Sequence, residues 1–153
     1  MINFTNEQEW KKHHLPSKKH ISNLLELVKQ EIAVSEQINF IINIYFANNK
    51  IIQEYNNKFR NKNKPTNVLS FGQISNKHQL QSVFKNTQVF YLGEIVLSFE
   101  TIKKEAFEMK KPFKKHLNHM IVHAILHLFG YDHIQDEEAE EMEAIEQKVL
   151  KNV

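Results

Sequence analysis

The chain has 153 residues, of which 41% are hydrophobic and 25% are charged, and its net charge is +2 at pH 7. This length fits one domain with a real core, the composition excludes wholesale disorder, and the small positive excess does not by itself indicate nucleic-acid binding. The sequence holds no cysteine, which excludes disulfides, thiolate zinc sites and a cysteine nucleophile.

The first part of the chain predicts two strands and two helices. Pro16 and Ser17 are typical of a helix start, and apolar residues follow them at helical spacing. Residues 37–47 are rich in isoleucine and aromatic side chains, as in a strand, and Asn48 can cap a following helix. In chain order we expect an edge strand at 2–4, a helix at 17–34, a strand at 37–47 and a helix from 48 to about 60.

The second part of the chain predicts two strands and three helices. A polar loop at 61–66 precedes them, and the polar stretch between the two strands is a candidate mobile loop. Ser98 and Pro112 are suited to helix starts, and Gly130 is suited to a helix end. We expect strands at 67–71 and 89–97, and helices at 101–109, 112–129 and 137–150.

The order of these elements predicts an α+β fold. Helices and strands are mixed without regular βαβ alternation, and no repeat, linker or domain boundary is visible. We therefore expect a single domain over residues 1–153, in which a small mixed β-sheet packs against helices.

The hydropathy of the chain predicts a cytoplasmic protein without membrane contact. Residues 1–4 lack the charged and then apolar layout of a signal peptide. The longest apolar run, at 40–47, is interrupted by Asn43 and falls far short of the roughly 20 residues that span a membrane.

Three histidines near the C-terminus have the spacing of a metal site. His123 and His127 are four residues apart, so on a helix they lie on one face with Cβ atoms about 6 Å apart. Gly130 can end the helix with a positive φ, which turns the chain back and brings His133 to the same point. Three neutral imidazoles suit one Zn²⁺ ion and leave its fourth position for water, as in catalytic sites. The segment therefore predicts a zincin-like metal helix rather than three ordinary histidines.

Other histidines compete for this interpretation. His119 and His123 are also four residues apart, and His116 extends the same stripe toward the N-terminus. We prefer the later set because only it has a helix stop and a third ligand that returns. A separate basic stretch, expected to be solvated, holds His13, His14 and His20.

Three further side chains are weaker candidates. Asp132 could support a metal ligand through a hydrogen bond, but it stands beside a glycine, where turn residues are common. Glu94 could act as a base toward water, although a surface carboxylate is the simpler interpretation. Arg60 could grip a phosphate, and an arginine at a helix end is equally typical of the protein surface.

The spacing His-x-x-x-His-x-x-Gly-x-x-His matches the zinc helix of metzincin proteases. Those enzymes carry a glutamate directly after the first histidine as the general base. This chain has Ala124 there, and alanine cannot take a proton. The sequence therefore predicts the scaffold of a zincin without its proteolytic chemistry.

Three motifs follow one another in a fixed order beside the histidines. They are Arg60 followed by Lys-Pro-Thr-Asn-Val-Leu-Ser-Phe at 64–71, Leu-Gly-Glu-Ile-Val-Leu-Ser at 92–98, and the histidine segment that ends in Gly-Tyr-Asp-His at 130–133. Together they resemble the YbeY family of bacterial rRNA-maturation endoribonucleases. Two positions depart from that pattern, because the family usually has glycine in place of Ala124 and aspartate in place of Glu94.

The resemblance implies a metal-dependent endoribonuclease that is specific for single strands. It implies action on the 3′ end of 16S rRNA and in ribosome quality control, with single-stranded RNA and ribosomal or small-subunit proteins as partners and no DNA. It also implies one Zn²⁺ ion on His123, His127 and His133, and a contribution of Arg60 to the active site. His123 and Arg60 are therefore the expected catalytic residues.

Two other functions stay open from the sequence. A zinc peptidase with another base, such as Glu94, would degrade an unstructured protein. A non-catalytic ribosome assembly factor would use zinc only to staple the helix to the turn that follows it.

Overall fold

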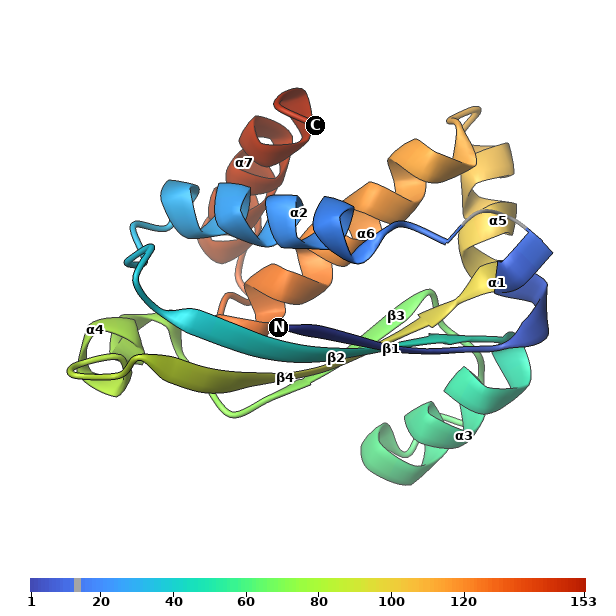
Figure 1. The fold of residues 1–153 in the computed structure, drawn as a ribbon. Coiled ribbons are helices and arrows are strands. Elements are labelled where there is room, and N and C mark those ends of the chain that lie inside the picture. Colours follow the sequence, from blue (N-terminus) through green and yellow to red (C-terminus); the bar gives the residue numbers. More distant parts are fainter. Residues whose placement is uncertain (13–14) are drawn as a thin grey trace.

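The computed structural model describes residues 1–12 and 15–153, and a mixed β-sheet forms its centre (Figure 1). Within the described residues, four strands lie side by side in the order β1-β2-β4-β3. Strands β1, β2 and β4 are parallel, and β3 pairs antiparallel with β4. The strands are β1 (Ile2–Asn6), β2 (Asn39–Ala47), β3 (Val68–Gly72) and β4 (Val89–Ser98).

Helices cover both faces of the sheet. Figure 1 places α2, α6 and α7 over one face and α3 beneath the other. Helix α6 contacts α2, α5, α7, β3 and β4, so it lies at the centre of the larger layer. The helices are α1 (Gln8–Lys12), α2 (Lys18–Glu31), α3 (Asn49–Arg60), α4 (Leu80–Val83), α5 (Phe99–Glu108), α6 (Phe113–Leu128) and α7 (Asp136–Lys151), with a 3₁₀ turn η1 (Lys77–Gln79). Among the described residues, no helix is long and apolar enough to cross a membrane.

The two faces of the sheet bury different apolar clusters. Side chains of β2 alternate between the faces, as a strand with two covered faces requires. The large cluster, on the side of α2 and α6, includes Phe40, Ile42, Ile44, Phe46, Ile21, Leu24, Ile121 and Ile125. The small cluster, on the side of α3, contains Ala47, Ile52, Leu69 and Val96. The predicted α+β fold with a small mixed sheet is therefore confirmed.

Helix starts follow the polar residues that the sequence marks, with one exception. Ser17 accepts a backbone hydrogen bond at the start of α2, and Asn48 Oδ1 accepts one from Ile51 N at 2.9 Å at the start of α3. Ser98 precedes α5 but makes no capping bond there. Its hydroxyl donates instead to Asn49 Oδ1 at 2.5 Å, which ties the end of β4 to the start of α3.

Two short segments differ from the sequence-based expectation. The polar stretch between β3 and β4 is not a plain loop, because it forms η1 and α4 and buries Leu80 and Phe84. Helix α1 has too few residues to reveal a helical period, and one side chain holds it in place. That residue, Trp10, is 1% exposed, and its indole Nε1 donates to Ala47 O at 2.7 Å.

Candidate metal centre

The rings of His123, His127 and His133 converge at the C-terminal end of α6. One ring nitrogen from each histidine lies within 4.8 Å of those of the other two. The ring centroids of His123 and His127 are 4.5 Å apart, and that of His133 lies 5.4 Å and 5.1 Å from them. Within the part of the chain that the structure describes, these three side chains form the group that could hold a metal ion.

Gly130 produces the turn that brings the third histidine back. Helix α6 ends at Leu128, and Gly130 follows with a φ of +83°, a conformation that side chains disfavour. A Cβ atom at this position would lie 2.6 Å from the backbone of Asn76 and Lys77. The close approach of the η1 segment therefore also requires glycine, and His133 returns toward the helix end as the spacing predicts.

Hydrogen bonds at Nδ1 orient the two helical imidazoles. His123 Nδ1 lies 2.7 Å from Glu146 Oε1, and His127 Nδ1 lies 2.9 Å from Tyr131 O. A carboxylate and a carbonyl only accept, so both Nδ1 atoms carry the proton. The two Nε2 atoms then present lone pairs toward each other, 3.0 Å apart. Partners of this kind fix the ring orientation of histidines that bind metals.

Glu146 on α7 is the residue of this site that the sequence analysis missed. Its carboxylate bridges two imidazoles, since Oε2 lies 2.7 Å from His119 Nε2 while Oε1 holds His123. Burial alone would raise the pKa of Glu146, but the hydrogen bonds from His119 and His123 outweigh it and lower the pKa to about 2. His119 is not one of the three converging histidines, and its Nε2 is engaged by Glu146, so it supports the cluster from outside.

The donor set fits a zinc ion. Burial lowers the pKa of His127 to about 4, with the charge of neighbouring His123 as the next cause, so His127 is a neutral ligand at neutral pH. Two nitrogens bound to a tetrahedral zinc ion at about 2.0–2.1 Å lie roughly 3.3 Å apart. The observed separation of 3.0 Å is within a small ring rotation of that value.

The histidine cluster opens onto a cleft between α6 and α7. The cleft has a volume of about 320 Å³ and includes His123, His133 and His119. Asn67, just before β3, lines it from the sheet side, and Glu143 lines it from α7. The cleft therefore leaves His123 and His133 open to a molecule that enters from solvent.

The structure separates the weaker candidates from the cluster. Glu94 shares the α3 face of the sheet with Val96, opposite α6, and accepts a hydrogen bond from Tyr91 at 3.1 Å. Asp132 accepts from the backbone N of the next residue at 2.8 Å, as a turn residue does. Arg60 is exposed at the end of α3 and does not line the cleft, so its catalytic role stays a prediction.

The other candidate histidines have separate partners or lie outside the description. His20, expected to be solvated, is half-buried and pairs with Asn118 Oδ1 at 2.8 Å. His116 is buried, with Nε2 2.7 Å from Glu105 Oε2, and is not a ligand of the cluster. The expectation for His13 and His14 falls outside the described residues.

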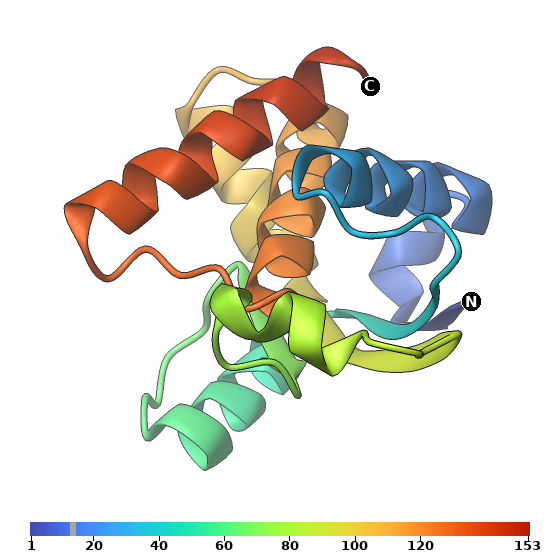
Figure 2. The same cartoon turned by 90° about the vertical axis from the view of Figure 1, so that its left-hand side faces the viewer.

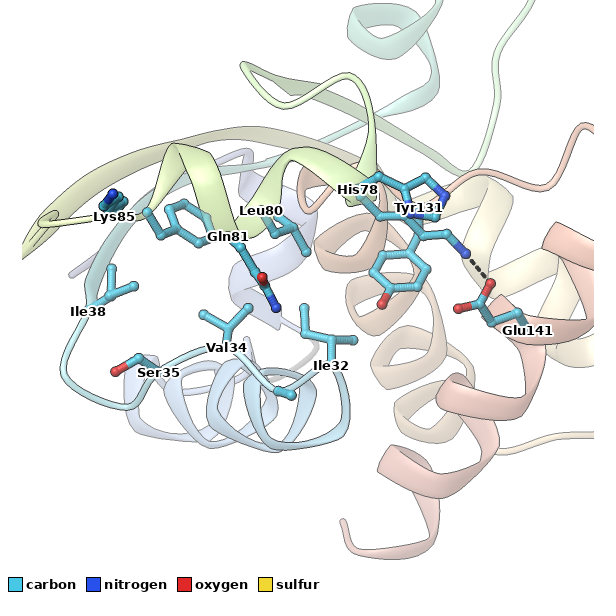
Figure 3. Close-up of a pocket in the computed structure, with 13 residues that line it drawn as sticks. Ile32, Val34, Ser35, Ile38, His78, Leu80, Gln81, Lys85, Tyr131 and Glu141 are labelled. Carbon is cyan, nitrogen blue, oxygen red and sulfur yellow. Dashed lines mark hydrogen bonds and ion pairs between the residues drawn. The ribbon is translucent and has the colours of Figure 1, made fainter.

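A larger cleft of about 500 Å³ lies on the other side of the turn after α6 (Figure 3). None of the three clustered histidines lines it. Its apolar wall comes from the end of α2 and from α4, and an ion pair between Lys77 and Glu141 closes one end. Tyr131 belongs to both regions, because its ring lines this cleft and its carbonyl holds His127.

Comparison with known proteins places the chain in a family. The family model described as Endoribonuclease YbeY matches residues 3–153. Endoribonuclease YbeY of Sinorhizobium fredii is 45% identical over 109 residues, which are 71% of this chain and only 60% of that protein. The protein of the same name from Francisella tularensis subsp. holarctica is 37% identical over 149 residues, which are 97% of this chain and 86% of that protein. The solution structure of a Thermotoga maritima protein has a TM-score of 0.59 and 26% identity, covering 99% of this chain and 91% of that one. This chain therefore belongs to the YbeY family.

Proposed function

We propose that this protein is a zinc-dependent endoribonuclease that cleaves single-stranded RNA. The convergence of His123, His127 and His133 beside an open cleft carries the proposal. The relatives from Sinorhizobium and Francisella bear the name Endoribonuclease YbeY, which supports RNA as the substrate class. The ordered motifs from Arg60 onward favour the same assignment.

The proposed chemistry divides between the ion and the protein. A zinc ion on three imidazoles supplies Lewis-acid polarisation of a phosphoryl oxygen. The Glu146 carboxylate and the Tyr131 carbonyl keep the protons on Nδ1 of their histidines, so that the Nε2 lone pairs stay available. Arg60 is proposed to hold the scissile phosphate through two hydrogen bonds once RNA is bound.

The proposed cellular role follows the resemblance to the family. We infer that the substrate is the 3′ end of 16S rRNA, that small-subunit or other ribosomal proteins are partners, and that the protein works in the cytoplasm during ribosome maturation and quality control. Exposed lysines after α3 would follow the RNA backbone, which makes binding sensitive to salt.

The test is cleavage by protein of measured zinc content. We expect cleavage of single-stranded RNA, with duplex RNA and single-stranded DNA of the same sequence left intact. His127→Ala should lose both zinc and cleavage, whereas His78→Ala, which changes an exposed histidine outside the cluster, should keep both. Inactivity of fully zinc-loaded protein on every RNA would refute the proposal.

The two alternatives have less support. A peptidase that uses Glu94 as its base is disfavoured because this side chain lies on the opposite face of the sheet from α6. In the second alternative, a non-catalytic assembly factor, zinc would only hold the end of α6 to the turn that follows at Gly130, and the position of His133 allows this. Growth of cells that carry a stable, zinc-bound but cleavage-dead variant at Arg60 distinguishes it, because an assembly factor would keep its function.

A further inference from the structure

An aromatic cluster with an exposed member lies beneath the sheet, away from the metal centre. It consists of Tyr55 and Phe59 on α3 and Phe71 on β3. The Phe59 and Phe71 centroids are 5.1 Å apart, and those of Tyr55 lie 5.9 Å and 6.2 Å from them. Phe59 is 55% exposed, so one large exposed ring packs against two half-buried rings.

One cation lies over this aromatic cluster, and others are near it in the sequence. Lys58 Nζ lies 5.3 Å from the centre of the Phe59 ring. From the start of α3 to the end of the following loop, five cationic side chains accompany one acid, Glu54. The cations are Lys50, Lys58, Arg60, Lys62 and Lys64. A flat apolar ring among positive charges matches a nucleobase attached to phosphates.

The loop after α3 is held against the helix rather than projecting from it. Asn56 Nδ2 donates to Lys64 O at 2.9 Å, and Gln53 Nε2 donates to Asn63 Oδ1 at 3.0 Å. The backbone N of Lys62 also returns to Asn56 O at 3.2 Å. These bonds hold the backbone of Lys62 and Lys64 against α3, which lowers the entropy cost when the loop contacts an RNA backbone.

The same loop leads from the aromatic cluster to the metal cleft. It ends at Asn67, which lines the cleft beside the histidines. Asn67 and Phe71 are four residues apart along β3, roughly 13 Å at the rise of a strand. In Figure 2 the loop between α3 and β3 runs on the same side of the molecule as the segment between α6 and α7.

We propose that Phe59 stacks on an unpaired base of an RNA strand that continues past the edge strand β3 to the metal cleft. The proposal rests on the proposed RNA substrate. It makes Tyr55, Phe59 and Phe71 a stacking platform, with Phe59 as the residue that touches the base. A duplex hides its base faces, so this platform selects single strands.

The test measures binding by metal-free protein, so that it does not depend on cleavage. Loss of stacking on one base weakens binding by about 5- to 100-fold. We expect that loss for Phe59→Leu with a labelled single-stranded RNA. Phe107→Leu makes the same change at a ring that is 85% exposed on α5 and should bind as the wild type does. An abasic strand of equal length should bind the wild type and Phe59→Leu alike.

A spectroscopic variant reports the contact itself. Phe59→Trp keeps a stacking face, and the single native tryptophan, Trp10, is buried. The fluorescence of the indole introduced by Phe59→Trp should therefore be quenched by RNA and not by the abasic strand. Unchanged RNA affinity of Phe59→Leu overturns the proposal. An equal loss on RNA and on the abasic strand also overturns it.

These outcomes are separate from those of the cleavage test. If the protein binds RNA through Phe59 but cleaves none, the nuclease assignment fails and the platform stands. If cleavage occurs and Phe59→Leu does not alter RNA affinity, the platform fails and the nuclease stands.

Discussion

Replacing Glu146 by glutamine tests whether the missed carboxylate organises the metal centre. Glutamine has the size and charge of the protonated acid, so E146Q removes the anion and little else. One amide can accept from His123 or from His119, but it cannot accept both imidazole protons at 2.7 Å as the carboxylate does. One of the two rings must then change its tautomer or its orientation.

The size of the effect follows from the pKa of this carboxyl group. Its pKa is about 2 in the folded protein against an ordinary value of 4.5, and the side chain is only 8% exposed, so solvent screens it little. At 1.36 kcal/mol for each pKa unit, the charge contributes about 3 kcal/mol to the stability of the metal-free protein at neutral pH. Losing a partner that orients a ligand weakens metal binding by about 10- to 100-fold.

Two assays check these numbers. Urea denaturation of metal-free protein at pH 7 should show the loss of stability, and competition with a chelator should show the loss of zinc affinity. Glu140→Gln changes an exposed acid of the same helix and should alter neither quantity. Because the folded pKa is depressed, the wild-type contribution is complete above pH 4.5 and is lost as the pH falls toward 2. Zinc affinity of E146Q within twofold of the wild type would refute the reasoning.

Three further predictions follow from the surroundings of the centre. Gly130→Ala should lower stability by about 2–3 kcal/mol or more, because the position needs a positive φ and the new Cβ would lie 2.6 Å from backbone atoms. Gly72→Ala should cost less, because its nearest contacts are 3.1–3.4 Å away and its φ is not in the positive region. Thermal melting of both variants checks this. Metal-free protein should lose stability as the pH falls from about 6.5 to about 4, because unfolding raises the depressed pKa of His127 and the unfolded chain takes up a proton. If the free energy of unfolding did not change with pH over that range, as in His127→Asn, this prediction would be contradicted. Ala124→Glu introduces the glutamate of the metzincin pattern, but Ala124 is 0% exposed and faces the core. The variant should therefore lose about 3 kcal/mol or more of stability and gain no peptidase activity. Thermal melting measures the stability, and digestion of casein measures the peptidase activity.

Local features of the fold and site could be predicted from the sequence. The spacing of His123 and His127 and the glycine after them act within one helix and one turn, so their consequence is visible along the chain. The same holds for Asn48, whose cap is made by a residue three positions later. The strands were recognisable from their β-branched and aromatic content.

Features that depend on packing between distant segments could not be predicted. Glu146 reaches His123 only because α7 packs against α6, and within the acidic block at 136–146 nothing in the sequence distinguishes it from its neighbours. The position of β3 at the sheet edge, antiparallel to β4, depends on tertiary pairing. Trp10 anchors a five-residue helix through a backbone carbonyl 37 residues away.

The three imidazoles differ in how firmly the protein holds them, and this difference bears on how an ion would bind and dissociate. Two rings stand on a packed helix with their Nδ1 protons already committed, so binding an ion freezes almost no motion in them. The ring of His133 is exposed and lies outside the helix. Most of the conformational entropy that is lost on metal binding would therefore come from the segment that carries His133. An ion in this site would therefore be held most firmly by His123 and His127, and His133 would be the first of the three ligands to release it.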